Sequence, residues 1–83
     1  MKLQNEFDFV KGQFAKNAEK IRDYASKLKA SGNYQDFEKR LTFDCLRAFV
    51  GVATMCDWYE KYNCNDSHIY TVGRKALKEL EII

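Results

Sequence analysis

Three neighbouring residues of this 83-residue chain are of types that bind zinc: Cys56, Cys64 and His68, with Asp66 between the last two. A cysteine and a histidine four residues apart across a helix start can act together as ligands. The sequence has no CxxC pair and no second histidine, however. We therefore expect no metal and no cofactor, with Cys45 and Cys56 buried as small apolar residues and Cys64 in a loop.

Acid–base catalysis is the other chemistry that these residue types suggest. Asp57 and Glu60 are three residues apart on a predicted helix, so their carboxylates lie on one face. With Lys61 beside them, the pattern is more typical of a solvated surface. His68 has no serine or cysteine nucleophile placed beside it by sequence, and GxGxxG, Walker-type and HExxH motifs are absent. We expect a protein that is not an enzyme.

A narrow polar edge on the helix predicted for residues 34–62 is better suited to binding another protein. Helical spacing places Arg40, Arg47, Thr54 and Trp58 on this edge. Tryptophan and arginine are enriched at binding hot spots, and Gly51 lets a partner approach the backbone. The alternative is that Trp58 only covers the end of the core.

A second candidate surface lies on the helix predicted for residues 3–30. Phe9 points about 120° away from the apolar stripe of that helix, and Lys16, Lys20 and Lys27 follow on the same face. A basic strip with an aromatic side chain is typical of nucleic-acid binding. Asp23 interrupts the strip, so a solvated helix face is the alternative.

These candidate sites depend on three predicted helices. The first carries an apolar stripe at alternating steps of four and three, in which Asn17 takes one place: Leu3, Phe7, Val10, Phe14, Ile21, Tyr24 and Leu28. Gly32 supplies a left-handed stop, Asn33 is suited to cap the second helix, and Asp36 lies in its first turn. This pattern predicts a tight helical hairpin.

The second predicted helix is apolar around most of its circumference, so both neighbours must pack on it. One face carries Leu41, Cys45, Ala48, Phe49, Val52, Met55, Cys56 and Tyr59, and the opposite face carries Phe43, Leu46, Val50 and Ala53. Because the third helix is shorter, part of this surface remains uncovered. We expect a second copy of the chain to cover it as a homodimer.

The third predicted helix follows a turn at residues 63–67, with Asp66 or Ser67 as its cap. Gly73 within its apolar stripe suggests a close backbone approach to the second helix. Residues 68–72 are also locally strand-like, but the apolar period continues unbroken to Leu80, which favours a helix. The predicted inward side is Ile69, Val72, Ala76, Leu77, Leu80 and Ile83.

Together these patterns predict an all-α fold, a three-helix antiparallel bundle in which a long helical hairpin packs with a shorter C-terminal helix. We expect residues 1–83 to form a single domain. The net charge of +2 is too small to imply nucleic-acid or membrane binding through bulk charge. A secretory signal, a membrane span and a disulfide framework are absent, so we expect a cytoplasmic protein.

The first functional hypothesis is a protein-interaction module that contacts its partner through Arg40, Arg47, Thr54 and Trp58. Small helical domains without cofactors often serve as adaptors, or as inhibitors and regulators encoded by phages and other mobile elements, which is an analogy of size and shape. The second hypothesis is a nucleic-acid-binding regulator that uses Phe9, Lys16, Lys20 and Lys27.

Overall fold

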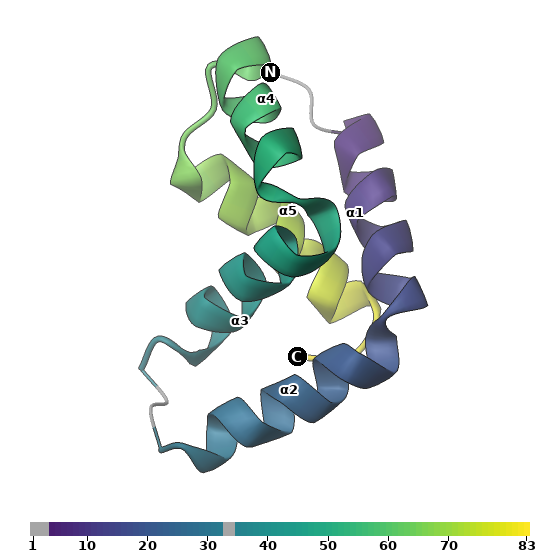
Figure 1. The fold of residues 1–83 in the computed structure, drawn as a ribbon, viewed down its shortest axis with the longest axis vertical. Coiled ribbons are helices and arrows are strands. Elements are labelled where there is room, and N and C mark those ends of the chain that lie inside the picture. Colours follow the sequence, from purple (N-terminus) through teal and green to yellow (C-terminus); the bar gives the residue numbers. More distant parts are fainter. Residues whose placement is uncertain (1–3, 33–34) are drawn as a thin grey trace.

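The computed structural model describes residues 4–32 and 35–83 and is all-helical, as predicted (Figure 1). Its elements are α1 (Gln4–Lys16), α2 (Ala18–Ala30), α3 (Phe37–Cys45), the π-helical turn η1 (Leu46–Val50), α4 (Val52–Tyr62) and α5 (Asp66–Glu79). The described residues contain no strand, and residues 68–72 belong to α5. Within these ranges, no helix has the length and apolar character that crossing a membrane requires.

The described ranges contain five α-helices where three were expected, because each of the two long predicted helices is divided. The first division is at Asn17, whose φ of −116° and ψ of 19° are not helical. Its side-chain Nδ2 donates to the Gln13 carbonyl at 2.8 Å, a competition with helical hydrogen bonding that is common for asparagine. Consequently α2 turns away from α1, as Figure 1 shows.

The second division is at Gly51, between η1 and α4. The Gly51 N–H donates to the Leu46 carbonyl at 2.9 Å, and Gly51 has φ 106° and ψ 142°, a conformation that is restricted in practice to glycine. Gln13 Nε2 of α1 donates to the Phe49 carbonyl at 3.1 Å, which satisfies an acceptor near the end of η1. We call the resulting corner, residues 37–62, the elbow.

The elbow changes which apolar residues are buried. Met55 and Trp58 lie on the inner face of α4 and are each only 6% exposed. Cys45 is buried as predicted, but the prediction that Cys56 is buried is wrong. The turn at Gly51 reorients α4 relative to α3, so one continuous face does not persist, and four apolar residues are exposed: Ala48, Val52, Ala53 and Cys56.

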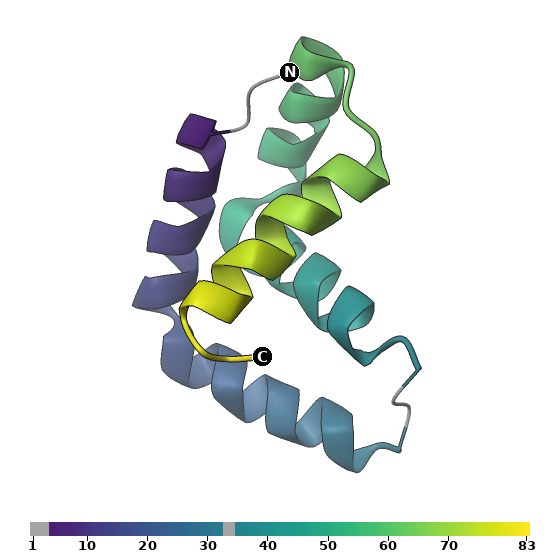
Figure 2. The same cartoon turned by 180° about the vertical axis from the view of Figure 1, so that it is seen from behind.

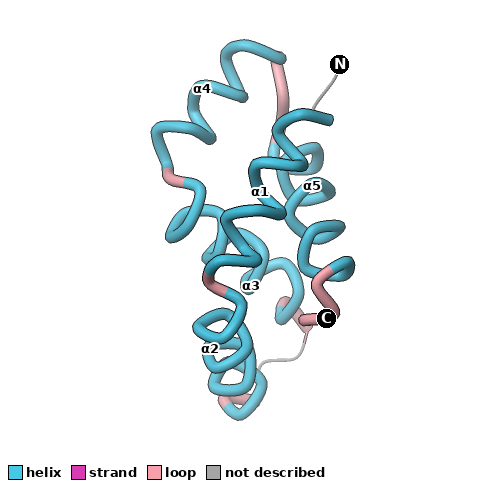
Figure 3. The backbone as a smooth tube through the Cα atoms, turned by 90° about the vertical axis from the view of Figure 1, so that its right-hand side faces the viewer, coloured by secondary structure: helices cyan, strands magenta, loops and turns pink. Residues whose placement is uncertain are grey.

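Helix α5 closes the core because it packs on both α1 and α3 (Figure 2). Its Ile69, Ala76 and Leu77 are fully buried, as predicted. The other predicted inward residues are half-buried, and of these only Val72 belongs to α5, because the helix ends at Glu79, before Leu80 and Ile83. Figure 3 shows that α4 and α5 lie to either side of α1. The core they share includes Val10, Phe14, Ile21, Leu41 and Leu46, all fully buried.

The helix ends follow the predicted turns with two changes. Gly32 has φ +84°, which confirms the left-handed stop, while Leu3 and the predicted cap Asn33 lie outside the described residues. Asp36 occupies the N-cap of α3 rather than its first turn. The N-cap of α5 is Asn65 instead of Asp66 or Ser67.

Gly73 makes the close approach that its place in the apolar stripe suggested. A Cβ atom on Gly73 would lie 2.6 Å from Thr42 Cγ2 and 3.0 Å from Leu46 Cδ1. Thr42 is fully buried and its hydroxyl donates to the Glu38 carbonyl at 2.6 Å, so the methyl group has little freedom to move. The backbone of α5 therefore lies directly on α3 and η1.

We expect Gly73→Ala to lower the free energy of unfolding by about 1–3 kcal/mol, because overpacking outweighs the gain in helix propensity. Gly12→Ala is the matched control: it also lies within a helix, but its Cβ would meet nothing within 4 Å. This control should raise the free energy of unfolding by up to about 1 kcal/mol. Urea denaturation followed by circular dichroism measures both, and equal stabilisation by the two variants would contradict the close approach.

Candidate functional site

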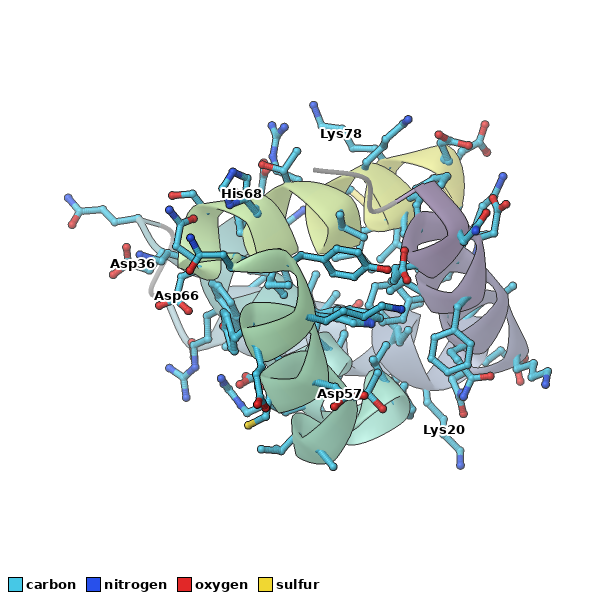
Figure 4. All side chains as sticks on the ribbon, turned by 90° about the horizontal axis from the view of Figure 1, so that it is seen from above. Lys20, Asp36, Asp57, Asp66, His68 and Lys78 are labelled. Carbon is cyan, nitrogen blue, oxygen red and sulfur yellow. The ribbon has the colours of Figure 1, made fainter. Side chains whose placement is uncertain are left out.

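A cleft of about 430 Å³ opens in the elbow, between α3 and α4. Phe43, Met55 and Tyr59 are buried or half-buried and form its apolar floor. Exposed charged side chains surround this floor, from α3 and its N-cap, η1 and the first residue of α5: Asp36, Lys39, Arg40, Arg47 and Asp66. We call this site the elbow cleft; Figure 4 shows Asp36 and Asp66 on the same side of the molecule.

Asp44 positions the two arginines of the rim. Its Oδ1 accepts a hydrogen bond from Arg47 Nη2 at 2.6 Å, and Arg40 Nε lies 3.9 Å from its Oδ2. The Tyr24 hydroxyl of α2 also donates to Oδ2, and this hydrogen bond is the main reason that the pKa of Tyr24 is raised. Exposed ion pairs contribute little to stability, so the main effect of this cluster is to orient the guanidinium groups.

Tyr59 joins α4 to α5 beside the cleft. Its hydroxyl donates to Asp66 Oδ1 at 2.6 Å. This hydrogen bond to a carboxylate disfavours the phenolate and, with burial, raises the pKa of Tyr59 to about 12. Asp66 is also in the first turn of α5, where the helix dipole favours a negative charge.

The four predicted partner-binding residues do not share one edge. Arg40 and Arg47 lie at the rim of the elbow cleft, whereas Thr54 and Trp58 line a separate pocket of about 250 Å³ that α1 also lines, through Phe9 among others. The division at Gly51 separates the two pairs. The burial of Trp58 agrees with the alternative that this side chain covers the core.

The predicted nucleic-acid strip is also divided. Phe9 is 46% exposed on α1, and Lys16 is the last residue of that helix. Lys20 and Lys27 lie beyond the bend at Asn17 on α2, and Lys27 Nζ is 3.1 Å from Asp23 Oδ2. The strip is therefore bent and partly neutralised.

His68 has a structural role at the start of α5. Its backbone N–H donates to Asn65 Oδ1 at 3.2 Å, and its Nδ1 accepts from the Asn65 N–H at 3.3 Å, which forms a capping box. Cys56 is exposed and Cys64 is half-buried. Among the residues that the structure describes, no group of three or more His, Cys, Asp or Glu side chains is placed to hold a metal ion.

The sequence patterns missed the floor of the elbow cleft. Phe43, Met55 and Tyr59 appeared as ordinary core residues of a continuous helix. Lys39 stood out in no pattern, and Asp66 appeared only as a helix cap or beside possible metal ligands. Gly51 is the signal that was available, because a glycine beside β-branched residues is a weak point in a helix.

Neither a family model, nor a curated protein, nor a solved structure matches this chain. The geometry of the elbow cleft therefore carries the functional inference.

We expect the Tyr59 phenol to titrate with a pKa of about 12, and Asp66→Asn to return this pKa toward the usual value of about 10. Because the pKa of Tyr59 is higher in the folded than in the unfolded state, its hydrogen bond to Asp66 stabilises the fold below about pH 10. This stabilisation is lost as the pH rises through the pKa of the folded state. The phenolate absorbance of the parent protein minus that of Tyr59→Phe measures the titration. An unchanged difference curve in the Asp66→Asn background would contradict the contact.

Proposed function

We propose that this chain is a non-enzymatic protein-interaction module, an adaptor or small inhibitor that regulates a partner protein by occupying part of its surface. The elbow cleft is the surface that binds the partner. The observation that carries this proposal is the apolar floor of Phe43, Met55 and Tyr59 inside a charged rim. Protein interfaces have this anatomy, with aromatic residues, methionine and arginine enriched.

The size and the order of the cleft support the proposal. Its volume of about 430 Å³ lies within the range of ligand pockets, roughly 300–1,000 Å³, so it suits a side chain that protrudes from a partner. Asp44 already holds Arg47, so less side-chain entropy is lost when a partner binds.

The proposal is tested by reversing the charge of the rim. We expect Arg40→Glu/Arg47→Glu to reduce recovery of the partner, from a lysate of the cells that make this protein, by at least about tenfold. The reason is that loss of each hot-spot contact typically costs more than about 1 kcal/mol of binding free energy. Affinity capture with quantitative mass spectrometry measures this recovery, and circular dichroism confirms that the variant is folded.

The matched control is Lys16→Glu/Lys20→Glu, which changes the net charge equally on exposed residues outside the cleft. Equal recovery of the partner by the rim variant and the parent protein, or equal loss in both variants, would refute the elbow cleft as the binding surface. Trp58→Ala is unsuited to this test because truncation of a buried tryptophan costs about 3–5 kcal/mol of stability.

The alternative function, nucleic-acid binding through Phe9, Lys16, Lys20 and Lys27, has less support because the bend at Asn17 divides these residues and Lys27 is paired with Asp23. Its signature would be an affinity for nucleic acid that falls steeply as the salt concentration rises. Lys16→Glu/Lys20→Glu would abolish this binding.

Self-association is the second part of the proposal: a second copy covers the exposed apolar residues of α1 and α4. The support for it is the exposure of Phe9 (46%) and Val52 (57%), since each adds apolar surface that burial would stabilise.

We expect native mass spectrometry to show a species of twice the 9.8 kDa chain mass. Phe9→Asp/Val52→Asp should convert it to monomer, because two carboxylates would be buried at the interface without partners. Asp8→Asn/Asp57→Asn, on exposed residues of the same two helices, is the control. A monomer at every concentration would refute self-association.

A further inference from the structure

The elbow cleft continues along α5. A second hollow, of about 180 Å³, shares Lys39, Phe43 and Asp66 with the elbow cleft and extends to Tyr70. A third hollow, of about 400 Å³, begins at Tyr70 and extends to Lys78. The second hollow shares three lining residues with the elbow cleft and one, Tyr70, with the third hollow, so the three hollows follow one another over the surface. We call this series of hollows the α3–α5 groove.

Positive charge predominates along the α3–α5 groove. Its lining contains six of the 14 basic residues of the chain but only three acidic ones. Of these acids, Glu79 is paired with Lys11 at 3.0 Å and Asp66 accepts the Tyr59 hydroxyl. The basic side chains are Lys39, Arg40, Arg47, Arg74, Lys75 and Lys78.

The basic residues divide into engaged and available ones. Arg40 and Arg47 contact Asp44, and Arg74 Nε lies 2.7 Å from Glu38 Oε1. Lys75 Nζ lies over the Phe7 ring, 4.6 Å from its centroid. Lys39 and Lys78 are exposed and, in the described part of the chain, form no ion pair. Two available ammonium groups therefore stand at different points along one groove, where they attract a negatively charged ligand.

The aromatic residues of the groove distinguish between two anionic ligands. Phe43 and Tyr70 are stacked on one another, with ring centroids 6.0 Å apart and an angle of 24° between the rings. Single-stranded nucleic acids bind through free ring faces on which bases stack, and one face of each of these two rings is already taken by the other ring. The carboxylates of Asp36 and Asp66 also oppose the evenly spaced phosphates of a nucleic-acid backbone.

A protein segment fits the same features because its charges need not be evenly spaced. An apolar side chain suits the floor of the elbow cleft, and separated carboxylates suit Lys39 and Lys78. Ser67 to Lys78 spans roughly 16 Å at 1.5 Å per helical residue. An extended segment covers that distance with about five residues.

We infer that the partner contributes an acidic segment that lies along the α3–α5 groove, with one apolar side chain in the elbow cleft and carboxylates at Lys39 and Lys78. This inference rests on the proposed function and adds the chemical class of the partner and the path that it follows.

The test uses a fluorescein-labelled peptide in which one leucine precedes alternating glutamate and serine, with a peptide that has glutamine for glutamate as its control. We expect fluorescence anisotropy to show binding of the acidic peptide and about tenfold weaker binding of the control. Lys39→Gln/Lys78→Gln should weaken binding of the acidic peptide about tenfold.

The matched variant Lys16→Gln/Lys20→Gln removes the same charge and should change the affinity by less than about twofold. Lys16 and Lys78 are each in the last turn of a helix, so the two variants lose similar helix-dipole stabilisation. Lys20 and Lys78 extend from opposite sides of the molecule in Figure 4.

Three results would overturn the inference: no binding of the acidic peptide, equal weakening by both lysine variants, or preferential binding of oligodeoxythymidine that depends on Lys39 and Lys78. Capture of the cellular partner by the variants distinguishes failure of this inference from failure of the proposed function. If its capture depends on Arg40 and Arg47 but not on Lys39 and Lys78, only the acidic-segment inference fails. If capture is independent of Arg40 and Arg47, the proposed function fails.

Discussion

The contact of the α5 backbone with α3 and η1 at Gly73 is the constraint on which the other features depend. With no side chain at this position, α5 lies close enough to bury Ile69 and Leu77. The same approach brings Tyr70 onto Phe43 and Arg74 onto Glu38. These two pairs lie about one helical turn apart, and they define the wall along which the α3–α5 groove runs.

The two helix divisions follow from the small size of the chain. An uninterrupted helix over residues 34–62 would be about 43 Å long, whereas the whole molecule measures 37 × 24 × 20 Å. A straight helix of that length would extend beyond α5, which has only 14 residues and could not cover it. Because the chain bends at Asn17 and Gly51, its 83 residues enclose one core. Met55 and Trp58 are buried in this core.

Sequence periodicity predicted the features that depend on local spacing. The all-helical class, the stop at Gly32, the inward side of α5 and the approach at Gly73 follow from apolar period and glycine position. The elbow could not be predicted from the apolar period, because the residues before and after Gly51 are apolar on both faces. Such a pattern continues unchanged through a bend. The separation of Arg47 from Trp58 has the same cause, since it depends on the direction of α4 rather than on its residues.

The elbow cleft exists only because the helix is divided. A continuous α-helix is convex everywhere, so Phe43 and Met55 would face outward along one rod instead of meeting in a hollow. The π-helical turn and the positive φ of Gly51 are local departures from ideal geometry, of a kind that often occurs at functional sites. Gln13 from α1 and Asp66 from α5 hold the two sides of this corner by hydrogen bonds. The concave surface is therefore a preorganised part of the fold, and a partner that binds there does not have to supply the energy to form it.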